Sequence, residues 1–265
     1  MALLSRVTIQ GYRSARDVIL EPGRTCVLVG ESWSGKSTVL AAVWTLLEAA
    51  APMPTGEDVS RGYSRVHVEA VVGERTLFLD ARPPATLNLN REGAPHALFF
   101  PSHLRASTLV ARTDSPAKQA IDLVHDETSA DGGLALIRSI GGLIRARVRG
   151  LVILIEEPEL YLSPPAQRHL HRLLRRLSAR GRNQVMYSTH APVFLGVDRL
   201  EDLVLVRHDE RTGTTLLQPQ AFPERRAFRL ITELDAERAE IFLSRAVLLV
   251  EGRTEKLVFP FVFQA

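Results

Sequence analysis

The pattern of hydrophobic and polar residues predicts two kinds of strand in this chain. Continuous apolar runs, typical of parallel strands buried on both faces, occur at residues 26–29, 98–100, 151–155 and 185–187. Strict alternation about Gly73 and Glu74, and again over 86–90, predicts antiparallel strands. We therefore expect an antiparallel β lobe at about 64–92 beside a mostly parallel core sheet, with a second hairpin over 203–217.

Helical spacing of apolar residues predicts the segments that flank this core sheet. Residues 38–50 and 134–147 each place apolar side chains at helical spacing, which predicts a helix over each range. A third helix is expected after Ser163, a good N-cap, with Pro164 and Pro165 in its first turn. Its leucines share one face and its arginines the other. The arginine face is either a solvated surface or a contact surface for a phosphate backbone. Strands alternating with helices indicate an α/β fold.

Composition narrows the class of protein. The chain has 265 residues, of which 45% are hydrophobic and 24% charged, which favours a globular core and argues against disorder. No apolar run is long enough to predict a membrane span, and the N-terminus lacks the layout of a signal peptide. Cys26 is the single cysteine and cannot form an internal disulfide, so we expect a cytoplasmic protein with no membrane partner. The net charge of +3 only weakly suggests nucleic acid.

The strongest chemical motif stands between a predicted strand and a predicted helix. Residues 30–37 fit the pattern G-x-x-x-x-G-K-S of a phosphate-binding loop. Gly30 and Gly35 let the backbone curl so that several N–H groups face one anion, and the helix N-terminus adds partial positive charge. Lys36 would reach the β- and γ-phosphates of ATP, and the Ser37 hydroxyl would ligate Mg²⁺. The predicted nucleotide-binding residues are Gly30, Glu31, Ser32, Ser34, Gly35, Lys36, Ser37 and Thr38.

Two further strands end in residues suited to nucleotide hydrolysis. Glu156 and Glu157 follow the apolar run 151–155, and the carboxyl ends of strands are where α/β sheets place ligands. We expect Glu156 to hold Mg²⁺ together with Ser37, and Glu157 to orient or deprotonate the attacking water. The next apolar strand ends close to His190, which we expect near the γ-phosphate as a hydrogen-bonding sensor.

Together these motifs resemble those of ABC-type ATPases of the RecF/SMC-like group, and within it the OLD (overcoming lysogenization defect) family. The resemblance covers residues 1 to about 207 and implies a P-loop NTPase fold of ABC type. Two departures are visible, because Ser32-Trp33 replaces a usual asparagine pair and Leu162-Ser163-Pro164 replaces a usual Leu-His-Pro. Trp33 would rest against either a nucleotide or neighbouring backbone. The resemblance is carried by Val7–Ser14, Gly30–Thr38, Ile155–Glu159 and Ser188-Thr189-His190.

The resemblance also implies a homodimer. ATPases of this group sandwich ATP between two subunits, and a signature loop of one subunit contacts the γ-phosphate held by the other. The best match here is residues 128–133, in which Ser129 and Gly132 would bind the nucleotide. An ordinary loop with a helix N-cap is the alternative for this segment. No heptad run is long enough for a coiled-coil arm, which excludes a long-armed clamp.

The C-terminal segment resembles the start of a Toprim nuclease domain. An apolar run ends in Glu251, and a glycine turn and a second acid, Glu255, follow. In the OLD family such acids bind divalent metal for phosphodiester cleavage, with further acids supplied by later strands. A solvated strand end is the alternative for Glu251. We therefore divide the chain into an ATPase domain at 1–235 and an incomplete Toprim-like segment at 236–265, without a complete nuclease site.

The sequence thus favours Mg²⁺-dependent ATP binding and hydrolysis by an OLD-like ATPase module, coupled to DNA processing or phage defence. A RecF-like DNA-repair ATPase that binds DNA without cutting it is the first alternative. An ATP-binding interaction module with little turnover is the second. The apolar tail at 257–263 indicates either a truncated form or a segment that docks on the ATPase or on a partner protein.

Overall fold

The computed structural model describes most of residues 1–219 and few of the residues that follow. The described residues are 3–49, 51–84, 86–102, 132–196 and 200–219, with single positions at 248, 250, 252, 254, 255, 258 and 262. Ser129 and Glu251, and with them most of the predicted signature loop and Toprim-like segment, lie outside these ranges. Within these ranges, no helix combines the length and the apolar character needed to cross a lipid bilayer.

The core is a six-stranded sheet with strand order β11-β10-β3-β9-β8-β7. Strands β7, β8, β9, β3 and β10 run parallel to their neighbours, and only the hairpin partner β11 is antiparallel. This confirms the expected mostly parallel sheet and the expected hairpin. The bounds are β3 (Thr25–Val29), β7 (His96–Phe100), β8 (Leu151–Glu156), β9 (Gln184–Thr189), β10 (Leu203–Asp209) and β11 (Gly213–Leu217).

The antiparallel lobe is larger than the sequence predicted. Its strand order is β2-β1-β4-β5-β6, so the two N-terminal strands belong to it as well as residues 64–92. Strand β1 pairs with β4 so that Val7 lies opposite Ala70, and alternate residues of both strands are buried. Local alternation reveals each strand but not this long-range pairing. The bounds are β1 (Leu4–Tyr12), β2 (Ala15–Leu20), β4 (Val66–Val72), β5 (Arg75–Arg82) and β6 (Thr86–Asn90).

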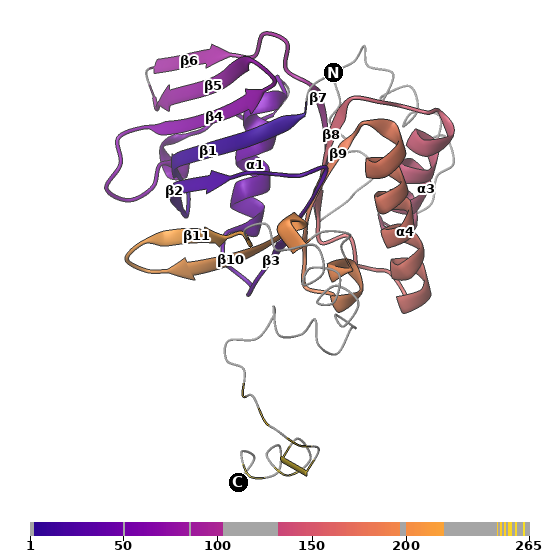
Figure 1. The fold of residues 1–265 in the computed structure, drawn as a ribbon. Coiled ribbons are helices and arrows are strands. Elements are labelled where there is room, and N and C mark those ends of the chain that lie inside the picture. The colour runs from indigo at the N-terminus through magenta and orange to yellow at the C-terminus, as the bar shows by residue number, and fades with distance from the viewer. Residues whose placement is uncertain are drawn as a thin grey trace.

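Helix α1 (Lys36–Leu47) lies between the two sheets, and helices α3 (Gly132–Arg145) and α4 (Pro164–Gly181) cover the other face of the core sheet (Figure 1). Successive residues of the core strands point to opposite faces. Leu28 therefore packs with α1 and the lobe, whereas Val27 packs with α3 and α4. Burial on both faces explains the continuous apolar runs. Short 3₁₀ helices occur at η1 (Gly56–Asp58), η3 (Pro192–Leu195) and η4 (Leu200–Asp202).

The helix boundaries differ slightly from those expected. Helix α1 begins at Lys36, two residues before the predicted start, so the motif lysine lies in the first turn. Helix α3 spans 132–145 where 134–147 was expected. Ser163 occupies the N-cap of α4 and Pro164 its first turn, as predicted, although the serine side chain makes no capping hydrogen bond.

Candidate functional site

Three strand ends meet at one edge of the core sheet. Strand β9 lies between β3 and β8 with all three parallel, so the residues that follow each strand are neighbours. A cavity of about 770 Å³ opens there. The segments predicted from the phosphate loop, the acid motif and the histidine all contribute to it. Its lining is Ser14, Ser32, Trp33, Gly35, Lys36, Ser37, Thr38, Ser102, Glu157, His190 and His208.

Two positions in the loop before α1 have a backbone conformation that only glycine adopts readily. Gly30 and Gly35 have φ values of 148° and 103°. A Cβ atom at Gly30 would collide with the carbonyl of Val206, and one at Gly35 would collide with the Thr214 hydroxyl. Trp33 also has a positive φ of 66°, and its side chain is 94% exposed at the rim of the cavity. Of the two options left open for Trp33, packing against neighbouring backbone is wrong.

Lys36 is held by the loop that precedes it. Its Nζ donates hydrogen bonds to the carbonyl oxygens of Gly30 at 2.9 Å and Glu31 at 2.6 Å. Burial lowers the pKa of Lys36 to about 8, although the nearby carboxylates, Glu157 first among them, favour the charged form. The ammonium therefore remains largely protonated at neutral pH, at a site where one positive charge faces an open cavity.

The paired acids at the end of β8 have different surroundings. Glu157 has a positive φ of 45° and donates its backbone N–H to the Ser188 carbonyl at 3.0 Å, which turns its side chain into the cavity. Glu156 is not among the cavity-lining residues, and its Oε2 accepts a hydrogen bond from the backbone N–H of Ser102 at 3.3 Å. Because the environments differ, the two carboxylates are equipped for different roles.

Glu157 and His190 both line the cavity and lie close to each other. The Nε2 atom of His190 lies 3.6 Å from Oε1 of Glu157. Burial lowers the pKa of His190, the positive charge of Lys36 lowers it further, and Glu157 acts in the opposite direction. The imidazole is therefore neutral at neutral pH, and it can both donate and accept a hydrogen bond.

The sequence did not single out Glu159, which fixes the histidine in place. Its carboxylate accepts hydrogen bonds from the backbone N–H of His190 at 2.6 Å and from the Thr189 hydroxyl at 2.9 Å. Burial raises the pKa of Glu159 despite these bonds, which favour the charged form. Glu159 belongs to the motif Ile155–Glu159, but its role depends on a contact between the ends of two strands. The spacing within one segment carries no signal for such a contact.

A chain of hydroxyl groups ties the lobe to the loop. The Ser14 hydroxyl donates to the Thr38 hydroxyl at 3.2 Å, and the Thr214 hydroxyl lies 2.9 Å from Ser14. Thr214 also donates to the carbonyl of Ser34 at 3.0 Å. These contacts join the turn after β1, the hairpin β10–β11 and the phosphate-loop segment. Thr214 was missed because it comes from an element remote in sequence, whereas Ser14 ends the segment Val7–Ser14 that carries the resemblance.

The donor set fits Mg²⁺ better than a soft metal. Ser37 lines the cavity, and Glu156 directly precedes the cavity-lining Glu157 in the chain. A hydroxyl and a carboxylate are hard oxygen donors, and Mg²⁺ commonly uses one or two protein oxygens together with phosphates and water. In the described ranges there is no cluster of three or more His, Cys, Asp or Glu residues that would form an all-protein metal cage.

The remaining predicted site residues are not gathered at this cavity. Gly132 begins α3, and the adjacent Gly133 packs closely against Leu162, in the loop after the acid motif. Glu255 is exposed in the C-terminal segment. The predicted roles of Ser129 and Glu251 fall on residues outside the described ranges.

The acid motif and the histidine lie in a segment that matches a known protein family. Residues 142–195 match a family model described as an AAA ATPase domain, and this range contains Glu156, Glu157, Glu159 and His190. A stretch of 111 residues is 37% identical to the OLD nuclease of Thermus scotoductus. That stretch is 40% of this chain and only 21% of the relative.

The fold is similar to that of SMC head domains. The SMC head domain from Thermotoga maritima superimposes with a TM-score of 0.53 at 14% identity, over 82% of this chain and 99% of that one. The Smc head domain with an extended coiled coil, derived from Pyrococcus furiosus and bound to the C-terminal domain of ScpA, gives 0.59 at 10% identity. That match covers 88% of this chain and all of the other. The chain thus has the α/β P-loop ATPase fold of SMC heads.

Proposed function

We propose that this chain binds and hydrolyses ATP with Mg²⁺ at the cavity on the carboxyl edge of the core sheet. The observation that carries the proposal is the meeting of Lys36, Ser37, Glu157 and His190 in one cavity of about 770 Å³. A phosphate loop and a carboxylate that can orient water recur in nucleotide-hydrolysing sites, and the neutral imidazole adds a hydrogen-bonding group at the same edge. The match of residues 142–195 to an ATPase domain supports the same conclusion.

Each residue takes a role that follows from its surroundings. Lys36 Nζ would exchange the carbonyls of Gly30 and Glu31 for β- and γ-phosphate oxygens, and the loop N–H groups would bind the same phosphates. Ser37 and Glu156 would hold Mg²⁺, whose charge would offset the negative charge that develops on the departing ADP.

Glu157 and His190 act on the side of the cavity where water attacks. Glu157 would orient the water and accept its proton, since its carboxylate faces the cavity. His190 would donate a hydrogen bond to the γ-phosphate, which a neutral imidazole does without adding a fixed charge. Glu159 would keep that imidazole in position through the His190 backbone N–H.

We also propose that two copies sandwich ATP and that turnover is coupled to DNA processing or phage defence. The partial match to an OLD nuclease and the SMC-head fold support this direction. A RecF-like ATPase that binds DNA without cutting it, or an interaction module with little turnover, would use the same cavity. Because two carboxylates alone make a weak Mg²⁺ site, we expect Glu251 and Glu255 not to support cleavage by this chain.

The central experiment compares Glu157→Gln with the matched change Glu74→Gln in the exposed turn of the β4–β5 hairpin. Phosphate release should fall about 100-fold for Glu157→Gln, with ATP affinity within about threefold of wild type. Glu74→Gln should leave both unchanged. ATP should also produce a dimer that Glu157→Gln traps, observed by size-exclusion chromatography with light scattering. Wild-type turnover in Glu157→Gln would remove Glu157 from its assigned role.

Two further assays separate the alternatives. Salt-dependent binding of a DNA duplex, with and without ATP, tests for the RecF-like activity. Incubation of supercoiled plasmid with Mg²⁺ tests for cleavage, and nicking by the purified chain would contradict the expected lack of a nuclease site. ATP binding without measurable phosphate release would favour the interaction module.

A further inference from the structure

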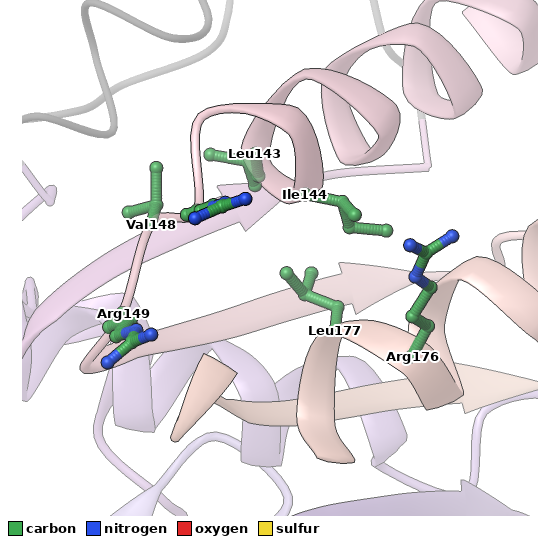
Figure 2. Close-up of a pocket in the computed structure, with 7 residues that line it drawn as sticks. Leu143, Ile144, Val148, Arg149, Arg176 and Leu177 are labelled. Atoms are coloured by element: carbon green, nitrogen blue, oxygen red, sulfur yellow. The ribbon is translucent and has the colours of Figure 1, made fainter. Parts of the chain in front are cut away.

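A second cavity lies at the opposite end of strand β8 from the proposed nucleotide site. It has a volume of about 300 Å³, and its apolar floor is built by Leu143, Ile144, Val148 and Leu177. The side chains of Arg147, Arg149 and Arg176 complete its lining. Figure 2 shows Arg149 and Arg176 on opposite sides of Leu177. Strand β8 begins at Leu151, just after this loop, and its six residues separate the two cavities by about 20 Å.

Buried hydrogen bonds fix the shape of this cavity. Asn183 is fully buried, and its Nδ2 donates to the carbonyls of Val148 at 3.1 Å and Leu177 at 3.3 Å. Its Oδ1 accepts the backbone N–H of Leu151 at 3.0 Å. One amide therefore joins the loop after α3, helix α4 and the start of β8. Such a cavity needs little rearrangement before a ligand binds.

The end of α3 places Arg147 at a position where glycine is usual. The backbone N–H of Val148 bonds to the Leu143 carbonyl at 3.1 Å, and that of Arg147 to the Ile144 carbonyl at 3.2 Å, which together make a Schellman motif. Arg147 is the left-handed residue of this motif, with φ of 53°. The chain thus carries a strained arginine at the rim of the cavity where a glycine would satisfy the backbone.

The charge around the cavity has one sign. Residues 132–150 contain four arginines and residues 164–182 contain six, and neither stretch has a single Asp, Glu or Lys. Arg147, Arg149 and Arg176 form no ion pair with any residue in the described part of the chain. The nearby helix C-termini carry roughly half a negative charge each, which three guanidinium groups outweigh.

We propose that this cavity, which we call the arginine pocket, binds an acidic peptide segment of a partner protein through one apolar anchor residue. The apolar floor would take the anchor side chain, and the three arginines would pair with carboxylates on either side of it. The volume of about 300 Å³ is at the small end for ligand sites and suits a single side chain. This proposal is independent of the nucleotide site.

The apolar floor favours a peptide over nucleic acid. A DNA backbone presents phosphates but no apolar group that would fill a cavity between two arginines. Leu143 and Leu177 are nearly fully buried, so this part of the floor belongs to the core and stays in place when the rim is occupied. Ile144 is partly exposed and offers apolar surface that an anchor can reach. A carboxylate-flanked apolar residue satisfies the floor and the rim together.

The test begins with selection of a displayed library of random peptides on the full-length wild-type chain. Selected peptides should share an apolar residue flanked by Asp or Glu. The best peptide is then synthesised with a fluorophore, together with a version in which alanine replaces the apolar residue. Binding is measured by fluorescence anisotropy against wild type, Arg147→Gly, Arg176→Gln and the control Arg61→Gln, an exposed arginine in the loop before β4.

The expected result separates binding from folding. Arg147→Gly should keep or raise the melting temperature, because glycine relieves the left-handed strain, yet weaken peptide binding about tenfold. Arg176→Gln should also weaken it about tenfold, and Arg61→Gln should not. The alanine peptide should bind at least about fivefold more weakly than its parent.

Three outcomes would overturn the proposal. One is a selection that yields no peptides, or peptides without an acidic excess. A second is equal binding of the alanine peptide, because the apolar floor would then be unused. The third is a short DNA duplex that binds wild type, loses affinity in Arg147→Gly and displaces the peptide regardless of its anchor, which would assign this face to nucleic acid.

Discussion

The two ends of strand β8 differ in the kind of charge that they gather. At the carboxyl end, Lys36, Glu157 and His190 line one cavity that holds both signs of charge, and Glu159 contacts His190 beside it. Burial shifts the pKa values of the lysine, the histidine and Glu159. At the amino end, three arginines surround an apolar floor, so the charge there is all positive. Phosphate chemistry uses a cation and a carboxylate side by side, whereas simple recognition needs only a fixed charge of one sign. The contrast agrees with the two proposals, which assign chemistry to one end and docking to the other.

The largest effect that would test this contrast is expected from Lys36→Ala. Lys36 lines the cavity and its Nζ is a charged donor, so ATP affinity should fall at least about 100-fold when the predicted contacts to phosphate are lost. Binding of a fluorescent ATP analogue measures this. Affinity of the arginine pocket for its selected peptide should stay at the wild-type value. A parallel loss at both ends would mean that the two cavities are not separate sites.

Asn183→Ala should act most strongly at the amino end of strand β8, where the arginine pocket lies. The substitution leaves the Val148 and Leu177 carbonyls and the Leu151 N–H without their buried partner, which should lower the free energy of unfolding by about 2–4 kcal/mol. Urea denaturation monitored by circular dichroism measures this change. ATP affinity of the folded fraction should remain within about twofold. Unchanged stability would contradict the role of Asn183 as the frame of the arginine pocket.

Glu159→Ala should reduce turnover without abolishing nucleotide binding. Loss of the acceptor for the His190 N–H would let the imidazole move, and kcat should fall about tenfold while KM changes less. Glu159→Gln is the matched control, because its amide oxygen can still accept from His190 and its nitrogen can donate to Thr189. Recovery of most of the activity in Glu159→Gln supports positioning. Equal loss in both variants would point to the negative charge itself.

The smallest effect is expected from pH, and it should differ between the ends. Folding lowers the pKa of Lys36 to about 8, and the ammonium is the form that binds phosphate. ATP affinity should therefore be full below about pH 8 and fall by up to about tenfold for each unit above it. Calorimetry at about pH 7 and pH 9 measures this, with proton uptake at the higher value. Peptide binding at the arginine pocket should not change, since arginine keeps its proton throughout this range. A flat ATP affinity would contradict the shifted lysine.

Most of the fold was readable because the two sheets bury their strands differently. Residues 151–155 face helices on one side and α1 on the other, so they form an unbroken apolar run. Strand β4 is buried only at alternate residues, which produces its period of two. The membership of β1 in the lobe was not predictable, because pairing of Val7 with Ala70 joins residues that are far apart in sequence.

The candidate site also combines residues that the sequence predicted with contacts that it did not predict. Lys36, Ser37, Glu157 and His190 were named from motifs whose spacing is set within a single strand–loop segment, and the structure brings all four to one cavity. The separate environment of Glu156, the hold of Glu159 on His190 and the contribution of Ser14 were not visible in the spacing.

The sequence by itself determined which segments become strands and helices and where the predicted phosphate loop lies between them, because these depend on the burial period and on neighbours within a few residues. The tertiary structure decided which strand ends meet, how far burial shifts Lys36 and His190, and that arginines from α3, its following loop and α4 surround one pocket. Those outcomes arise from contacts between segments distant in the chain, and the free energy of such contacts is set by geometry that no local pattern encodes.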